Sequence, residues 1–115
     1  MKAASVISLL LALFLVINET KAQVIYETKW KGDADVQVYI TEWKGDADLI
    51  VYTTTWKGDA QGKNEGIWYY TEWKGDAKKQ IYITKWKSYA DLIVYYTKWK
   101  GDAGWQKKEK KNLLQ

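Results

Sequence analysis

Carboxylates, lysines and tryptophans recur together in this chain, and they are the side chains with which it could do chemistry. Two units bring carboxylates close in sequence, as Asp33 with Asp35 and Asp46 with Asp48. Such pairs can serve acid–base hydrolysis of glycosides or, with further oxygen ligands, calcium binding. The spacing of a calcium loop is absent, however, and each pair follows a Lys. The pattern is therefore more typical of a solvated turn.

The residue types that are missing exclude several other chemistries. The sequence contains no His and no Cys, which removes zinc and copper sites, Cys nucleophiles and Ser-His-Asp relays. After residue 22 the only Ser is Ser88, and no suitable base accompanies it. We therefore expect no catalytic, cofactor-binding or metal-binding residue, and no enzymatic activity.

The formal net charge of +4 comes from the two ends of the chain. Residues 23–106 contain 12 Lys and 12 Asp plus Glu, so this part is neutral. A nucleic-acid-binding protein is expected to spread its basic residues over one folded face. We predict no nucleic-acid partner. The basic tail, residues 106–115, is expected to be disordered and available to contact anionic surfaces.

The repeated tryptophans allow two interpretations, because Trp rings bind sugars in lectins and also fill protein cores. We predict that they form the core, together with the Tyr four residues before each Trp and the Ala four residues after it. The predicted core residues are Tyr26, Trp30, Ala34, Tyr39, Trp43, Ala47, Tyr52, Trp56, Ala60, Tyr69, Trp73, Ala77, Tyr82, Trp86, Ala90, Tyr95, Trp99 and Ala103.

The elements that position these residues are predicted to be strands. The Trp, the Thr two before it and the Tyr four before it lie on one side of a strand with a period of two. The other side is apolar at its start and charged at its end. It is the better candidate for a contact surface or a filled ring interior. The residues that we expect to form a ligand surface there are Trp68, Tyr70, Ile40, Ile83 and Tyr96.

The spacing of the units predicts a closed architecture. The six Trp are separated by 13, 13, 17, 13 and 13 residues, so one longer connection divides the units into three and three. Lys-Gly-Asp-Ala turns the chain after each strand, but the fifth unit has Ser and Tyr in place of Gly and Asp. The turn therefore needs no positive φ. Since the terminal units are as aromatic as the central ones, we expect a closed, ring-like, all-β arrangement of six 13-residue repeats rather than an open solenoid.

The first 22 residues have the pattern of a secretory signal peptide. Lys2 precedes an apolar run over residues 6–17, and the small residues Thr20 and Ala22 precede a cleavage site before Gln23. The run is shorter than the roughly 20 residues that a membrane span needs. We therefore expect a secreted protein, extracellular or periplasmic, with a repeat domain over residues 23–105.

The repeats resemble the septoil knot domain family. The resemblance covers residues 24–105 and includes Gly66-Ile67-Trp68-Tyr69-Tyr70-Thr71 and Ala103-Gly104-Trp105. Family members often have Tyr-Lys-Ser-x-Ala-Asp where this chain has Trp-Lys-Gly-Asp-Ala. Trp86-Lys87-Ser88-Tyr89-Ala90-Asp91 is nearest to that form. The resemblance implies a β-rich chain wound round a ring and deeply knotted, with seven crossings, but it implies no function.

These observations predict a secreted, non-enzymatic and highly stable structural or binding module. The alternative is a multivalent carbohydrate-binding protein that uses the repeated Trp and Asp residues. The expected partner is a glycan or another protein of the envelope or extracellular space. Exposure of the six rings separates the two interpretations, because buried rings form a core and exposed rings are free to bind.

Overall fold

The computed structural model describes residues 23–60 and 64–115. The predicted signal peptide lies outside these ranges, as does part of the long connection between the third and fourth units. Within them, the structure has no helix of the length and apolar character that a membrane crossing requires.

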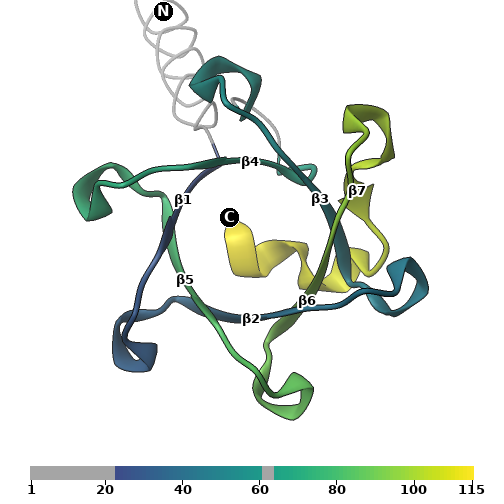
Figure 1. Cartoon of the computed structure of the whole chain (residues 1–115), viewed down its shortest axis with the longest axis horizontal. Helices are drawn as coiled ribbons and strands as arrows, with labels where there is room; N and C mark the ends of the chain where they lie inside the picture. Colours follow the sequence, from purple (N-terminus) through teal and green to yellow (C-terminus); the bar gives the residue numbers. More distant parts are fainter. Residues whose placement is uncertain (1–22, 61–63) are drawn as a thin grey trace, which may run out of the picture.

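One short strand from each unit contributes to the framework of the fold (Figure 1). Each ends three residues before the repeated Trp, and one turn of 3-10 helix begins at the Lys after that Trp. Alternating β-branched and aromatic residues favour the strands, and Gly and Asp favour the turns. The strands are β1 (Val24–Glu27), β2 (Val36–Ile40), β3 (Leu49–Thr53), β4 (Ile67–Tyr70), β5 (Lys79–Ile83) and β6 (Leu92–Tyr96). The turns are η1 (Lys31–Asp33), η2 (Lys44–Asp46), η3 (Lys57–Ala60), η4 (Lys74–Asp76), η5 (Lys87–Tyr89) and η6 (Lys100–Asp102).

These strands pair in parallel and close into a ring, so the predicted closed all-β arrangement is confirmed. The order is β4-β1-β5-β2-β6-β3, and a pairing of β3 with β4 completes the circle. A short seventh strand, β7 (Gly104–Trp105), pairs with β3 in the antiparallel sense. Closure leaves the ring without the exposed edges that make open sheets prone to aggregation.

The two halves of the chain alternate around this ring. Strands β1, β2 and β3 make one winding, and β4, β5 and β6 occupy the places between and beside them. The long connection between the third and fourth units joins the first winding to the second. The seven-crossing knot that the family resemblance implies stays a prediction.

The turns use ordinary backbone conformations, as the fifth unit predicts. Among the described residues, only Gly66 and Gly104 have positive φ, so the glycines of the five Lys-Gly-Asp turns do not need it. Gly66, at the end of the long connection, has φ 88°. A Cβ there would lie 2.4 Å from the carbonyl oxygen of Ile50. No other residue fits this close approach without a shift of the backbone.

The interior of the ring is filled by the residue five before each repeated Trp. All six of these side chains are 0% exposed: Ile25, Val38, Val51, Trp68, Ile81 and Val94. Val36, Leu49 and Leu92, two residues earlier on their strands, extend the same cluster. Because a ring of six strands encloses little space, it accepts aliphatic side chains and one indole more readily than six Tyr–Trp pairs.

The predicted core is therefore wrong for the six repeated tryptophans, which lie on the outside and are 65–74% exposed. Their Tyr companions are half-buried on the same outer side, and of the six Ala only Ala47 and Ala60 are buried. Alternation places residues on one of two faces, but it does not say which face turns inward. The inward face is determined by the volume of the interior, which is filled by the smaller side chains.

The predicted ligand surface also needs correction. Trp68 is fully buried, and Ile40, Tyr70, Ile83 and Tyr96 are half-buried against the core cluster. The hydroxyl groups of Tyr70 and Tyr96 are hydrogen-bonded at 2.6 Å. Burial raises the pKa of both phenols, and the charge of Glu27 adds to the rise. Most of these residues belong to the filled ring interior, which was the other interpretation of this side of the strands, and Tyr96 also lines an outer groove.

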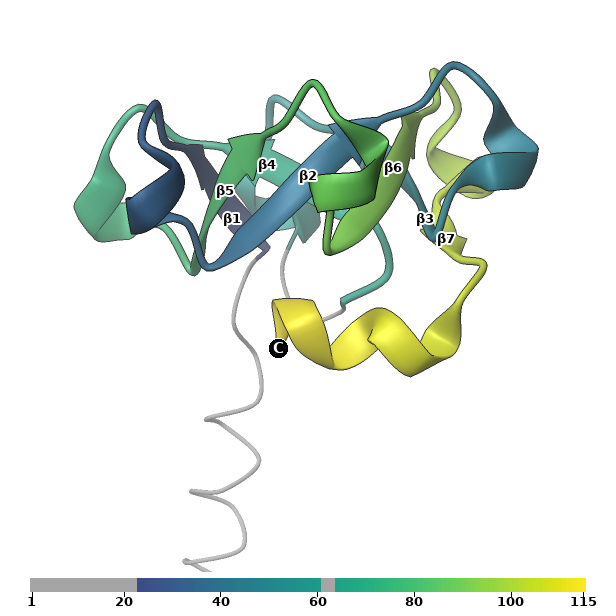
Figure 2. The same cartoon turned by 90° about the horizontal axis from the view of Figure 1, so that it is seen from below.

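The C-terminal tail is ordered, contrary to the prediction of disorder. Residues Lys108–Leu114 form a 3-10 helix, η7, that lies across one end of the ring (Figure 2). Leu114 is 0% exposed, and its carbonyl accepts a hydrogen bond from the side-chain amide of Gln23. The Lys-rich composition suggests a solvated segment, but Leu113 and Leu114 supply an apolar contact that outweighs it.

Two lysines of the tail form ion pairs with a buried carboxylate. The Asp48 side chain is 0% exposed and lies 3.0 Å from the Lys110 ammonium and 3.4 Å from that of Lys107. It also accepts a hydrogen bond from the Ile93 N–H at 2.9 Å. Burial by itself would raise the pKa of Asp48. The Ile93 hydrogen bond and the two lysines outweigh burial and hold this pKa below its ordinary value.

This pKa makes the stability of the protein sensitive to acid. A carboxyl group whose pKa is lower in the folded state stabilises that state above its unfolded pKa, about 3.9 for Asp. The contribution is lost as pH falls through the folded value. We expect the melting temperature to fall between about pH 5 and pH 2, and to fall less in Asp48→Asn, as circular dichroism would measure. Parallel acid profiles for the two proteins would contradict the assignment.

Candidate binding site

The six turns form equivalent loops around the outside of the ring (Figure 1). Loops 1 to 6 are defined here as residues 30–34, 43–47, 56–60, 73–77, 86–90 and 99–103. In every loop, the Trp N–H donates to the hydroxyl oxygen of the Thr two residues earlier, at 3.1–3.2 Å. The Trp carbonyl then accepts the N–H of the residue three places later, at 3.0–3.1 Å. The backbone of each Trp is thus fixed while its ring faces solvent.

Neighbouring loops are linked through the Lys and Asp of Lys-Gly-Asp. Four of the six loop lysines reach the Asp of the next loop around the ring in the same direction, with N–O distances of 3.6–3.8 Å. All the side chains involved are about half-exposed, so each pair contributes little to stability. Their effect is to hold a cation and an anion together at each linked junction, and at the Lys44–Asp102 junction the pair lies beside Tyr95 and Trp99. The pairs are Lys74–Asp33, Lys87–Asp46, Lys44–Asp102 and Lys100–Asp59.

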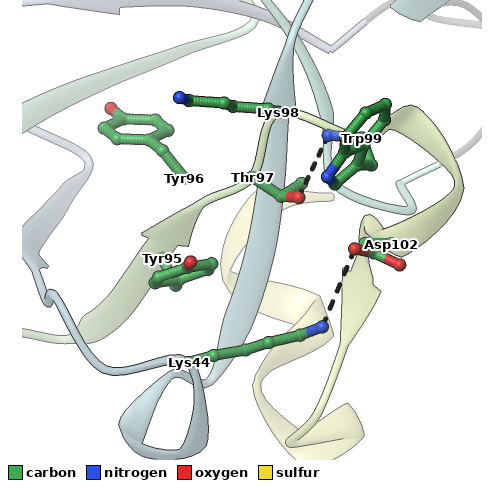
Figure 3. Close-up of a pocket in the computed structure, with 7 residues that line it drawn as sticks. All are labelled: Lys44, Tyr95, Tyr96, Thr97, Lys98, Trp99 and Asp102. Carbon is green, nitrogen blue, oxygen red and sulfur yellow. Dashed lines mark hydrogen bonds and ion pairs between the residues drawn. The ribbon is translucent and has the colours of Figure 1, made fainter.

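A groove lies at one of these junctions, between loop 2 and loop 6 (Figure 3). Its volume is about 350 Å³, and Tyr95 and Trp99 supply aromatic surface. The ion pair of Lys44 with Asp102 supplies a donor and an acceptor beside these rings. Thr97, Tyr96 and Lys98 complete the lining. The same residue types recur at the same spacing in the other units, because Tyr, Thr and Trp are present in all six.

Carbohydrate-binding sites commonly combine an exposed aromatic face with polar groups that are fixed beside it. The less polar face of a pyranose ring packs on an indole or phenol, and its hydroxyl groups need both donors and acceptors at the edge. The loops offer this combination several times over. Among the described residues, no group of three or more carboxylates is placed to hold a metal ion.

The two carboxylates of each pair identified in the sequence make different contacts in the structure. Asp33 pairs with Lys74 in the loop, whereas the carboxylate of Asp35 accepts the Gln80 N–H of the neighbouring strand at 2.8 Å. In the same way, the carboxylate of Asp48 accepts the Ile93 N–H and that of Asp91 accepts the Gln37 N–H. Each of the three therefore joins adjacent strands. This role was not predicted, although an Asp directly after the repeated Ala in three units was a usable signal.

The comparisons with known proteins address the family and not the site. A family model described as the 7(1) septoil knot domain matches residues 22–106, which is most of the chain. Neither the curated proteins nor the solved structures gave a match. The chain therefore belongs to the septoil knot domain family.

Proposed function

We propose that the protein is a secreted, non-enzymatic binding module that recognises carbohydrates through several equivalent loops. The observation that supports this function is the 65–74% exposure of six tryptophans whose backbones are fixed in the same way. Exposed Trp rings at this density have no part in the core, and exposed apolar surface in a stable protein commonly marks a binding site.

The polar groups of the loops favour a saccharide over a purely apolar partner. An apolar partner would have to desolvate a lysine and an aspartate at each linked junction, which is unfavourable without new hydrogen bonds. A sugar supplies those hydrogen bonds through its hydroxyl groups while it covers the ring. Because the sites face outward around the ring, one protein could bind several glycan chains at once, with the gain in avidity that multivalency brings.

The test is a glycan array followed by calorimetry with a monovalent oligosaccharide that the array identifies. Trp43→Ala should remove one site per chain, and replacement of all six exposed Trp should abolish binding. Truncation of an aromatic residue at the centre of a contact commonly costs about 2 kcal/mol or more, so the affected site should weaken roughly thirtyfold. The fold should persist, because each ring is exposed.

Glu109→Ala is the control for Trp43→Ala. Glu109 is exposed and lies in η7, outside the six loops that carry the repeated Trp. We expect this variant to keep both the affinity and the number of sites. Unchanged binding after removal of all six rings, in a protein with an unaltered circular dichroism spectrum, would refute the proposal. An array on which no glycan binds would refute it as well.

A further inference from the structure

The junction of loop 1 with loop 5 differs from the linked junctions described above. Loop 5 has Tyr89 at the position where the other loops have Asp. Lys31 of loop 1 reaches towards it in the same direction as the other lysines, but meets an aromatic ring. Its ammonium nitrogen lies 5.0 Å from the centre of the Tyr89 ring. A cation–π contact has thus replaced an ion pair.

This replacement changes the charge beside Trp86. At the Lys–Asp junctions the two charges cancel, whereas the Lys31–Tyr89 contact keeps the full positive charge of the lysine. Within residues 23–60 and 64–115, Lys31 makes no ion pair with a carboxylate. A second lysine, Lys85, directly precedes Trp86, and its counterpart Lys98 lines the groove beside Trp99.

Loop 5 also keeps the aromatic surface of the site. Trp86 is 65% exposed and Tyr89 is 58% exposed, so two rings face solvent where the other loops present one Trp and a carboxylate. A neutral sugar at this position would lose the acceptor that Asp supplies elsewhere. A negatively charged sugar would gain a cation without meeting a carboxylate of the loop.

We propose that the site at Trp86, formed by Lys31, Tyr89 and Trp86, prefers saccharides that carry an anionic group, either a carboxylate or a sulfate ester. This inference rests on the proposed carbohydrate-binding function and divides the loops into two classes. At the linked Asp loops, the carboxylate offsets the charge of the lysine and accepts hydrogen bonds from neutral sugars, so an anionic sugar gains no net attraction there. Specificity thus arises from the uncompensated lysine at one site and the neutralised lysines at the linked junctions.

The test compares tri-galacturonate with its methyl ester, which has the same sugar skeleton and no charge, by calorimetry. A sulfated galactose oligosaccharide forms a third arm and distinguishes sulfate from carboxylate recognition. We expect one site per chain to bind at least one of the two anionic ligands about tenfold or more tightly than the ester. We also expect this preference to weaken as NaCl is raised, since salt screens exposed charges.

Four variants make the assignment specific. Tyr89→Asp should restore an ion pair with Lys31 and abolish the anionic preference, and Lys31→Gln should abolish it too. Lys44→Gln is the matched control, because Lys44 holds the equivalent place in loop 2 and pairs with Asp102. It should leave the anionic site unchanged. Asp102→Tyr should create a second anionic site, so that the number of tight sites per chain rises from one to two.

Each outcome decides between the two proposals. Binding of neutral sugars through the Asp loops, without any preference for the anionic ligands, would overturn this inference and leave the proposed function standing. An anionic preference that survives Tyr89→Asp would also overturn it. Failure of every saccharide to bind would overturn both proposals. Binding to anionic lipid vesicles and to no saccharide would also overturn both proposals. It would indicate that the junction of loop 1 with loop 5 contacts a membrane surface.

Discussion

Trp68→Ala should lower the free energy of unfolding by about 3–5 kcal/mol, the usual range for truncating a fully buried aromatic side chain. The indole of Trp68 is 0% exposed at the centre of the ring and meets Tyr70 edge to face, with 6.0 Å between ring centroids. Its removal would leave a cavity that strands on every side enclose. Urea unfolding followed by circular dichroism would measure the loss.

Trp73→Ala is the matched control, because it makes the same substitution five residues later. Trp73 is 71% exposed, and we expect a change of less than about 0.5 kcal/mol. The comparison tests directly whether the single interior Trp and the repeated Trp have the different roles assigned to them. Equal destabilisation by the two substitutions would show that the exposed rings contribute to the core after all.

Asp48→Asn should lower the free energy of unfolding by about 1.5–3 kcal/mol, the range for hydrogen bonds to charged groups. The substitution keeps the size of the side chain and its acceptor for the Ile93 N–H. It removes the charge that faces Lys107 and Lys110. Because both lysines are partly exposed, at 54% and 34%, water can solvate them once the carboxylate is gone. The expected loss is therefore below that for breaking a fully buried ion pair.

Asp46→Asn is the control for this prediction. Asp46 lies two residues before Asp48 and is 3.7 Å from the Lys87 ammonium, but its side chain is 51% exposed. Exposed pairs contribute about 0–1 kcal/mol, so the protein should keep most of its stability. Chemical unfolding of both variants at neutral pH gives the comparison. An Asp48→Asn protein as stable as Asp46→Asn would show that the two ion pairs of Asp48 do not contribute to holding η7 against the ring.

The strands, the turns and the closure of the ring could be predicted from the sequence because they depend on local spacing. Alternation and the position of Gly and Asp determine where each strand ends, and the single longer connection marks the change of winding. The inward face could not be predicted in this way. It depends on the volume enclosed by six strands, and the repetition of Trp and Tyr indicated a conserved role in each unit without saying whether that role was packing or exposure.

The candidate site was visible in the sequence only as an alternative. The repeated Trp and Asp suggested sugar binding, but the direction of the Lys–Asp links depends on which loops are neighbours. Loops 2 and 6 adjoin in the ring and are far apart in the chain, so Lys44 and Asp102 could not be paired from spacing. The same reason explains the tail, where Lys110 meets a carboxylate 62 residues earlier.

The alternation of the two windings has a consequence for how the protein is made. None of the first three strands pairs with another of the three; their partners are β4, β5, β6 and β7. A nascent chain that ends before Ile67 thus contains no β-sheet hydrogen bonds between its strands. Folding must wait for the second half to be synthesised, and contacts between such distant segments form slowly. A polypeptide that stays unpaired during its synthesis would suit the secretion that we propose.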